Sequence, residues 1–345
     1  MKKELLLDAV YINNGGGKIL LDYLIESLEK QNLLVTYLLD ERIKNNHPKI
    51  KESNTVLYHD ASFFKRLHFY KKNRNNFRTI FCFGNIPPLM KCQGKVFTYF
   101  HQTLFIDPIP KDFSFTEKLK FELKIATLQY FSSNCTTWVV QNERVKLELA
   151  RKFNLKQEKI KILPFYPSIK YLGKPIAKIK NSFLYVSGAA PHKNHKNLIL
   201  AFCDFFDKHK VGQLTVTVNF GFDEVLDLIS QKQKQNYPII NVGFLGHVEL
   251  SKIYAESEFL VFPSCTESFG LGLVEAIENN CNIIASDLAY THAVCKPSLL
   301  FNPFEKDSIT EALESALEKT FKKSESVIQN KINEILNLLQ NENTK

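Results

Sequence analysis

Two acidic residues eight positions apart, Glu267 and Glu275, flank a pair of glycines in the stretch ESFGLGLVEA. Gly270 and Gly272 fall where a helix over residues 273–279 would begin, and each glycine costs such a helix about 1 kcal/mol relative to alanine. Glycines in a first helical turn leave backbone N–H groups accessible to an anionic ligand. The N–H groups that we expect to contact such a ligand are those of Phe269, Gly270 and Leu271.

The two carboxylates could hold the groups on either side of a bound diphosphate. With a rise of 1.5 Å per residue, Glu267 and Glu275 would lie about 8–12 Å apart. That separation could place one carboxylate on sugar hydroxyls and the other on ribose hydroxyls, since carboxylates accept hydrogen bonds from paired hydroxyls well. Acids near a helix start are also ordinary partners of the helix dipole, which is the alternative explanation.

A polar turn with two lysines and two histidines, PHKNHK at residues 191–196, follows the first strand pattern of the second half of the chain. Lys193 or Lys196 would stand at the N-terminus of a helix over 198–206, where an ammonium group and backbone N–H groups suit an anion. His192 and His195 lie three residues apart, but no third acid or thiol ligand is near them, so we expect no metal site. A solvated basic turn is the alternative.

Near the N-terminus, Gly15, Gly16 and Gly17 precede a helix that we expect to begin at about Lys18. Glycines there permit close approach of a phosphate. The spacing is not that of a dinucleotide-binding G-x-G-x-x-G motif, and no acid stands where it could bind a ribose. A flexible strand-to-helix turn is the alternative.

His101 directly follows an apolar strand pattern in the stretch VFTYFHQTLFI. Ligands of parallel sheets bind at the carboxyl ends of strands, so this imidazole would lie where a ligand binds. It could donate a hydrogen bond to a substrate oxygen or steady charge near neutral pH. A histidine with a purely structural role is the alternative.

Short apolar segments rich in β-branched and aromatic residues alternate with helical patterns, which predicts parallel βαβ units. The series breaks at LPFYPSIKYLGKP, residues 163–175, where three prolines and a glycine interrupt it, and then starts again. We therefore expect an α/β protein of two domains, 1–166 and 167–325, followed by a C-terminal helix in 326–345. The expected strands are 5–12, 34–39, 55–58, 79–83, 95–100, 136–140, 161–163, 182–187, 214–218, 239–242, 258–262 and 282–285.

Composition excludes several classes of protein. With 44% hydrophobic and 23% charged residues the chain has the profile of a globular protein with a sizeable core. No stretch approaches the 18 apolar residues of a membrane span, and acids interrupt the N-terminal apolar run, so we expect a cytoplasmic protein. The seven cysteines form no C-x-x-C pair and are odd in number, which predicts neither a zinc knuckle nor a disulfide framework.

The net charge of +9 is unevenly distributed. Residues 1–166 contain 27 Lys and Arg against 16 Asp and Glu, whereas residues 167–345 contain 18 against 20. A basic first half indicates an anionic partner, whether phosphate, membrane surface or nucleic acid. A compositional bias toward Lys and Asn is the alternative explanation.

Together these motifs resemble the retaining glycosyltransferases of family 4, whose fold is the two-Rossmann-domain architecture called GT-B. ESFGLGLVEA has the family's pattern of two acids separated by seven residues, with Glu267 and Glu275 in its two positions. HKNHKNLILAF resembles the phosphate-binding lysine and helix of polysaccharide-assembling members. GGGKILLDYL and His101 fall where the family has its glycine loop and sugar-contacting histidine. Many members carry an arginine five residues before the lysine, and Gly188 takes that place here, so either Lys193 works alone or His192, His195 or Lys196 compensates.

The resemblance implies two Rossmann-like parallel-sheet domains facing across a cleft, an N-terminal one for the acceptor and a C-terminal one for the donor. It implies a hexosyltransferase that moves a sugar, with retention at the anomeric carbon, from a nucleotide-sugar to a hydroxyl of a glycan or lipid-linked oligosaccharide. Assembly of surface polysaccharide, such as lipopolysaccharide O-antigen or capsule, would be its setting. Neither a cofactor nor a metal is expected. The implied catalytic residues are His101, Lys193 and Glu267, and the implied donor-binding residues are Gly15, Gly16, Lys193, Phe269, Gly270, Leu271 and Glu275.

Two other functions remain open from the sequence. One is a nucleotide-sugar epimerase with the GT-B fold, although the acid pair favours transfer. The other is a nucleic-acid-binding protein, favoured by the charge and by FFKRLHFYKKNRNNFR, residues 63–78, which has six Lys or Arg, five aromatics and no acid. We expect no nucleic-acid partner.

The same basic stretch, and the segment 113–131, also suit a membrane surface. An ordinary solvated helix explains the first equally well, and a core helix explains the second. We therefore expect a cytoplasmic protein that could make peripheral contact with the inner face of the cell membrane.

Overall fold

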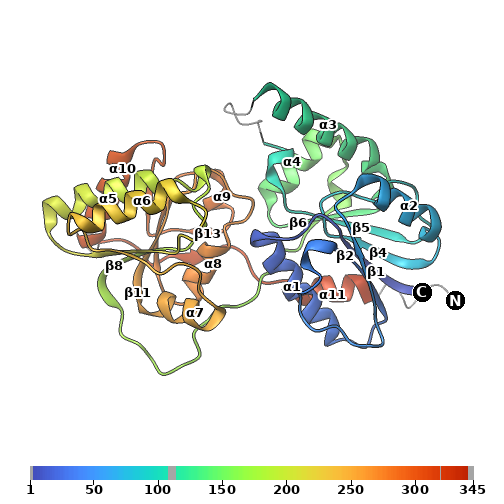
Figure 1. Ribbon diagram of the computed structural model, residues 1–345, viewed down its shortest axis with the longest axis horizontal. Helices are drawn as coiled ribbons and strands as arrows, with labels where there is room; N and C mark the ends of the chain where they lie inside the picture. Colours follow the sequence, from blue (N-terminus) through green and yellow to red (C-terminus); the bar gives the residue numbers. More distant parts are fainter. Residues whose placement is uncertain (1–2, 108–113, 319, 341–345) are drawn as a thin grey trace. The chain divides into compact units, whose positions relative to one another are not determined.

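The computed structural model shows two compact α/β units (Figure 1). It describes residues 3–107, 114–318 and 320–340. Unit 1 is formed by the chain up to Pro167 and again from Gln329 onward, and unit 2 is formed by Ser168–Ile328. Each unit is built on a parallel sheet, which confirms the predicted fold class of two parallel-sheet domains.

The sheet of unit 1 has seven strands, all paired in parallel. They are β1 (Lys3–Ala9), β2 (Val35–Asp40), β3 (Thr55–His59), β4 (Phe77–Cys82), β5 (Lys95–Phe100), β6 (Thr137–Val140) and β7 (Ile160–Ile162). Their order in the sheet is β3-β2-β1-β4-β5-β6-β7. The order reverses between β1 and β4, and ligands of such sheets bind at the reversal point. The glycine loop after β1 therefore lies where a ligand is expected.

Helices surround this sheet, and short 3-10 turns occur at Glu41–Ile43, Thr103–Phe105, Ser132–Asn134 and Gln157–Lys159. The helices are α1 (Gly15–Glu29), α2 (Phe63–Asn73), α3 (Phe115–Phe131), α4 (Glu143–Phe153) and α11 (Ile332–Gln340). Side chains cap several of them: Asn142 accepts from the N–H of Val145 at the start of α4, for example. α1 begins at Gly15 and not at Lys18, so all three glycines belong to its first turn.

The sheet of unit 2 has six parallel strands in the order β10-β9-β8-β11-β12-β14. They are β8 (Ile179–Tyr185), β9 (Gln213–Val216), β10 (Ile239–Asn241), β11 (Ser257–Phe262), β12 (Asn282–Ser286) and β14 (Leu299–Phe301). β13 (Cys295–Lys296) and β15 (Glu325–Ser326) form a separate antiparallel pair. The order reverses between β8 and β11, so the loops that follow these two strands are at the expected ligand-binding edge.

Six helices complete unit 2 in the described part of the chain. They are α5 (His195–His209), α6 (Asp223–Lys234), α7 (His247–Glu256), α8 (Leu271–Glu278), α9 (Ala289–His292) and α10 (Lys306–Glu318). A 3-10 turn over Pro191–Lys193 precedes α5 directly. α5 begins three residues earlier than the predicted helix over 198–206, because Asn194 adopts a left-handed conformation that ends the turn and starts the helix.

Each of the twelve predicted strands overlaps an observed strand. β14 (Leu299–Phe301) was not predicted. The C-terminal prediction is wrong in part: Ser326 belongs to β15, and the last helix begins only at Ile332.

The C-terminal helix α11 belongs to unit 1. Its buried face is formed by Ile332, Ile335, Leu336 and Leu339. The residues just before it are tied to unit 1 by hydrogen bonds: the N–H of Lys331 donates to the carbonyl of Pro164 at 2.7 Å, and the Asn330 amide donates to the carbonyl of Tyr166 at 2.6 Å. The chain therefore passes from unit 1 to unit 2 and back again.

A buried ion pair lies at the centre of unit 1. Arg66 of α2 is 2% exposed, and its Nε donates to Asp8 of β1, which is 1% exposed, at 2.9 Å. The remaining guanidinium N–H groups donate to the carbonyls of Ile86 and Pro87, and the Tyr70 hydroxyl donates to Asp8. The predicted reading of residues 63–78 as a solvated basic surface is therefore wrong for Arg66, Phe69 and Tyr70, which belong to the core.

We expect Arg66→Met to destabilise the protein by about 3–5 kcal/mol, because the charge of Asp8 would stay buried without its partner. Urea unfolding followed by circular dichroism measures this effect. Lys72→Met is the matched control, since Lys72 lies exposed on the same helix, and it should change stability by less than about 0.5 kcal/mol. Equal stabilities of the two variants would contradict the structural role of the pair.

Candidate active site

The turn that follows β8 is held rigidly in unit 2. The hydroxyl of Tyr185, the last residue of β8, donates to the carbonyl of Lys193 at 2.8 Å. Asn194 adopts a left-handed φ of 60°, and its amide donates to the carbonyls of Pro263 and Pro303 at 3.2 and 2.7 Å. Asparagine tolerates this conformation better than most residues. The turn thus presents Lys193 in a fixed position.

The loop that follows β11 is joined to this turn. The carbonyl of His192 accepts from the N–H of Cys265 at 2.8 Å and from the Ser264 hydroxyl at 3.3 Å. The hydroxyl of Tyr290 donates to the carbonyl of Ser264 at 2.7 Å. Since β8 and β11 are neighbouring strands, these bonds fix two adjacent loops to each other at the carboxyl edge of the sheet.

Lys193 and Glu267 meet at this edge. The Nζ of Lys193 lies 2.5 Å from Oε1 of Glu267, and their side chains are 22% and 11% exposed. Two residues predicted as catalytic from separate motifs are therefore in direct contact. In this partly buried pair the ammonium group is held in place by the carboxylate, ready to contact an anion at the same edge.

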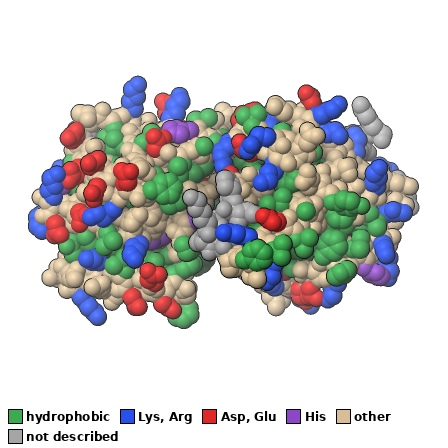
Figure 2. All heavy atoms as spheres, turned by 90° about the horizontal axis from the view of Figure 1, so that it is seen from above, with side chains coloured by type: hydrophobic (Ala, Val, Ile, Leu, Met, Phe, Trp, Pro, Cys, Tyr) green, Lys and Arg blue, Asp and Glu red, His purple; other side chains and the backbone are tan. Residues whose placement is uncertain are grey.

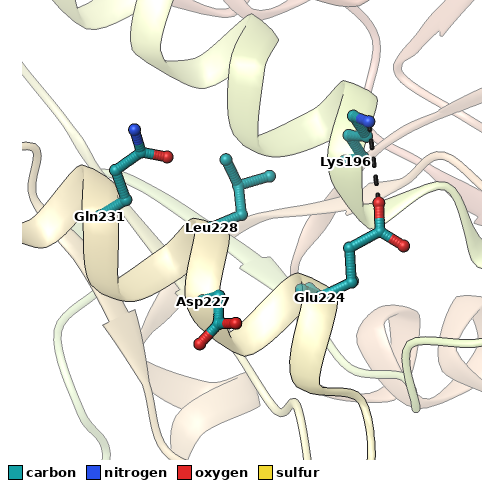
Figure 3. A pocket seen from close by; sticks show the side chains of 6 residues that line it. Lys196, Glu224, Asp227, Leu228 and Gln231 are labelled. Carbon is teal, nitrogen blue, oxygen red and sulfur yellow. Dashed lines mark ion pairs between the residues drawn. The ribbon is translucent and has the colours of Figure 1, made fainter.

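The other polar residues of the 191–196 turn do not join this pair. Lys196 points toward α6 and forms an exposed ion pair with Glu224 at 3.7 Å, beside a shallow pocket between α5 and α6 (Figure 3). The prediction that Lys196 shares the anion site with Lys193 is thus not supported.

The two histidines of the turn are poorly suited to carry charge. His195 is 2% exposed and packs on Tyr185 at a ring distance of 4.6 Å; burial lowers the pKa of its imidazole to about 4. Burial, together with the charge of Lys193, also lowers the pKa of His192. Both rings are neutral at pH 7. Neither histidine therefore supplies the positive charge of the absent arginine, although a neutral ring can donate a hydrogen bond.

The start of α8 has the geometry expected for an anion-binding helix end. Gly270 precedes the helix with φ +76°, a left-handed conformation that a side chain would strain. Leu271 is the first helical residue, and the N–H groups of a first helical turn have no acceptor within the helix. Phe269 is 3% exposed, so its side chain anchors the loop.

Gly272 has a packing role. A Cβ built on Gly272 would lie 3.1 Å from the ring of Phe262 and 3.4 Å from the hydroxyl of Tyr254. The absence of a side chain therefore lets α8 approach β11 and α7 closely. Packing therefore accounts for Gly272, whereas the sequence predicted ligand access for both glycines.

Glu275 is buried one turn into α8. It is 9% exposed, and its Oε2 accepts from the Tyr254 hydroxyl at 2.8 Å. Burial raises the pKa of Glu275 to about 7, although the hydrogen bond from Tyr254 acts in the opposite direction. Tyr254 was not predicted, because its contact with Glu275 spans 21 residues and depends on how α7 packs on α8.

In unit 1, His101 and the glycine loop lie together. A Cβ built on Gly17 would be 3.0 Å from Cε1 of His101, so the third glycine makes room for the imidazole. Gly15 and Gly16 are exposed, and Gly15 has φ +62°. Asn85, which was not predicted, accepts from the N–H groups of His101 and Gln102 at 2.7 and 2.9 Å. Asn85 thus holds the His101 backbone in place.

The imidazole of His101 is neutral at pH 7. Burial lowers its pKa to about 4, and its ring stacks on Phe83 at 5.3 Å. Its Nε2 lies 3.1 Å from the carbonyl of Phe83, and a neutral ring that donates this hydrogen bond keeps Nδ1 as an acceptor. The prediction that His101 steadies charge near neutral pH is therefore wrong; an acceptor role toward a hydroxyl is the one that the geometry allows.

The described residues contain no metal-binding cluster, no disulfide and no helix able to span a membrane. In residues 3–107, 114–318 and 320–340 no three His, Cys, Asp or Glu side chains gather in a way that could hold a metal ion. All seven cysteines are free thiols, of which Cys92 and Cys265 are half-buried and the other five are buried. Within the same ranges, no helix combines the length and the apolar character that crossing a membrane requires.

Residues 173–334 match the model of the family described as glycosyl transferases group 1. The O-antigen chain mannosyltransferase RfbU of Salmonella typhimurium is 25% identical over 246 residues, which cover 69% of this chain and 67% of RfbU. The other curated relatives that match are each covered over less than half of their own length.

Two solved structures share the architecture of both units. Sucrose-phosphate synthase from Thermosynechococcus elongatus superposes with a TM-score of 0.69 at 15% identity, over 92% of this chain and 90% of that one. Anabaena Alr3699/HepE, in complex with UDP-glucose, superposes with a TM-score of 0.65 at 15% identity, over 93% and 91%. The family model covers residues 173–334, most of which lie in unit 2, and both units share the GT-B fold of these solved structures.

Proposed function

We propose that the protein is a retaining hexosyltransferase that moves a sugar from a nucleotide-sugar to a hydroxyl group of a glycan or lipid-linked oligosaccharide in surface polysaccharide assembly. The observation that carries this proposal is the 2.5 Å contact between Lys193 and Glu267 at the carboxyl edge of the unit 2 sheet. RfbU, a relative of this chain, is named a mannosyltransferase of the O-antigen chain, and HepE was solved with UDP-glucose.

In this proposal the donor diphosphate binds to Lys193 and to the N-terminus of α8. The ammonium group and the N–H groups near Gly270 and Leu271 present positive charge, and the oxygens of a departing nucleoside diphosphate carry negative charge. Groups that are already fixed before the reaction stabilise this developing charge without reorganisation. The hydrogen bonds that hold Lys193 in its turn supply that fixation.

The two carboxylates take the sugars on either side of the diphosphate. Glu267, beside Lys193, accepts from hydroxyls of the transferred sugar, and Glu275 accepts from ribose hydroxyls. Ribose hydroxyls bind an ionised carboxylate more strongly than a protonated one. Because burial holds the pKa of Glu275 at about 7 in the free protein, donor binding would favour loss of its proton.

The transfer step needs no nucleophile from the protein. The acceptor hydroxyl oxygen forms a bond to the anomeric carbon as the bond from that carbon to the diphosphate oxygen breaks. The acceptor proton passes to the departing diphosphate oxygen, on the same face of the sugar, which retains the anomeric configuration. The residues position the reactants and stabilise the leaving charge, which are the main sources of catalysis in such a site. We propose that neither a metal nor another cofactor takes part.

Unit 1 provides further substrate-binding residues in this proposal. Nδ1 of His101 accepts from a substrate hydroxyl, and the exposed N–H groups near Gly15 and Gly16 approach the donor. A lipid-linked acceptor would place the enzyme at the inner face of the cell membrane as a peripheral protein. We propose no nucleic-acid partner.

Isothermal titration calorimetry with UDP-, GDP- and ADP-sugars, and with an oligonucleotide as control, tests the proposal. We expect one nucleotide class to bind with a Kd below about 1 mM, the range of typical donor affinities, and the oligonucleotide not to bind at 0.15 M salt. Tight, salt-sensitive oligonucleotide binding without nucleotide-sugar binding would support the nucleic-acid alternative. Conversion of the nucleotide-sugar to its epimer without an acceptor would support the epimerase.

A further inference from the structure

Helix α3 carries apolar residues on two opposite sides. On the inner side, Phe121 stacks on Phe105 at 5.4 Å, Ile125 packs against the core, and Leu128 is fully buried. These positions follow the i, i+4, i+7 spacing of one helical face. The inner side therefore accounts for how α3 is attached to unit 1.

The outer side of α3 is apolar and exposed. Phe115, Leu119, Leu123 and Tyr130 are 81%, 58%, 68% and 78% exposed. With 3.6 residues per turn they form one stripe opposite Leu128, running along a helix of about 25 Å. Burial in the core does not require these side chains, and a continuous exposed apolar stripe of this size marks an interaction surface.

Aromatic contacts extend the stripe onto the start of α2. The ring of Tyr130 contacts Phe131 at 4.9 Å, Phe131 contacts Phe63 at 6.3 Å, and Phe63 contacts Phe64 at 5.7 Å. Phe64 is 77% exposed. We call the side chains of Phe63, Phe64, Phe115, Leu119, Leu123 and Tyr130 the apolar ridge.

The segment that contains the start of α2 is basic. No Asp or Glu occurs between residues 61 and 106, and every Lys or Arg there except the buried Arg66 is exposed: Lys65, Lys71, Lys72, Arg74, Arg78, Lys91 and Lys95. On α3 itself, three lysines outnumber Glu117 and Glu122, and Glu117 is engaged in the capping box with Ser114. Figure 2 shows hydrophobic side chains gathered on the face of unit 1 where α3 lies, with Lys and Arg side chains and some Asp and Glu side chains around them.

We propose that the apolar ridge binds the surface of an anionic lipid bilayer. Leu and Phe side chains on a surface helix insert at the boundary between headgroups and acyl chains, and nearby Lys and Arg side chains pair with anionic headgroups. Lys120 and Lys124 are exposed on α3, where their stems can lie along the apolar surface while their ammonium groups reach the phosphates. The inference rests on the proposed function in one respect: a lipid-linked acceptor would be presented to the enzyme at the bilayer surface.

Vesicle flotation with the full chain tests the proposal. One set of vesicles contains phosphatidylglycerol and phosphatidylcholine, and the other phosphatidylcholine alone. We expect binding to the anionic vesicles that falls at 0.5 M salt. The double variant Leu119→Gln with Leu123→Gln changes no charge, and glutamine is a good helix former. It should lower the partition coefficient onto anionic vesicles at least tenfold.

Matched variants separate the apolar and the electrostatic contributions. Leu172 lies in unit 2 and is 89% exposed, so the Leu172→Gln variant should bind vesicles like the unmodified protein. Lys120→Gln with Lys124→Gln should lower binding to anionic vesicles about fivefold to thirtyfold, and should have little effect with phosphatidylcholine alone. Circular dichroism checks that each variant is folded.

Three results would overturn the proposal. The unmodified protein could stay in solution with anionic vesicles, or the double leucine variant could bind as well as the unmodified protein. Sedimentation without vesicles could instead show a dimer that the double leucine variant dissociates, which would assign the ridge to a second copy of this chain. Calorimetry with the nucleotide-sugar distinguishes membrane binding from the proposed function. The double leucine variant should bind the donor normally. A protein that binds vesicles but no donor would refute only the proposed function.

Discussion

Replacing Lys193 by alanine should lower kcat for sugar transfer by about 10²- to 10³-fold, the usual cost of removing one fixed group that stabilises a leaving charge. Hydrogen bonds from Tyr185 and Asn194 hold the backbone of the turn, and Glu267 holds the ammonium group of Lys193. Its removal takes positive charge away from the position proposed for the diphosphate. Steady-state kinetics, with release of the nucleoside diphosphate as the signal, measures the loss.

Lys196→Ala is the control for this variant. Lys196 lies three residues along the same segment, but its partner is the exposed Glu224. Exposed pairs contribute little, so Lys196→Ala should change kcat by no more than about twofold. Lys193→Ala should unfold at a temperature close to that of the unmodified protein, since its ion pair is only partly buried. Similar kcat values for the two variants would remove Lys193 from the proposed mechanism.

Replacing Glu275 by glutamine should change both donor binding and the pH dependence of stability. The folded protein holds the pKa of this carboxyl at about 7, whereas the value in an unfolded chain is near 4.5. Between these values the unfolded state binds fewer protons, so stability falls as pH rises. The contribution is fully present below about pH 4.5 and is lost above about pH 7, a change of about 3 kcal/mol. Glutamine has no proton to lose, so the variant lacks this change.

Urea unfolding of both proteins at several pH values between 4.5 and 8 measures this effect. The difference between their free energies of unfolding cancels the contributions of the other titrating groups.

Donor affinity should change with pH in the opposite direction to stability. Because ribose hydroxyls favour the ionised carboxylate, affinity in the unmodified protein should rise as pH increases through about 7. In Glu275→Gln it should be about tenfold or more weaker at pH 8 and nearly independent of pH, since a hydrogen bond to a charged group is replaced by one to an amide. A pH-dependent affinity that survives in the variant would place the titrating group elsewhere.

The sequence predicted the positions of Lys193 and Glu267 well because local rules govern both. Each follows a strand whose pattern was clear, and neighbouring parallel strands bring their carboxyl ends to one edge of a sheet. The place of Gly270 at the start of α8 was predictable for the same reason, but its left-handed conformation was not predicted.

The errors involve contacts between residues that lie far apart in the chain. Arg66 reads as a surface residue among other basic residues, and only its pairing with Asp8, 58 positions away, places it in the core. Gly272 was expected to leave the helix start open to a ligand, and its packing against Phe262 and Tyr254 has no local signal in the sequence. The low pKa of His101 comes from burial by aromatic rings, which no motif records. For α3, the sequence pattern left a core helix and a surface helix open, and the structure shows a core side together with an exposed one.

The return of the chain to unit 1 has a consequence for how the protein is made. Residues 329–340 include α11, whose Ile335 and Leu339 are fully buried. Unit 1 therefore lacks part of its hydrophobic core until the ribosome has translated these residues. Unit 2, which is continuous in the chain, can mature first during synthesis. The apolar surface of unit 1 that α11 covers therefore stays exposed in the newly made protein until this last helix has been synthesised.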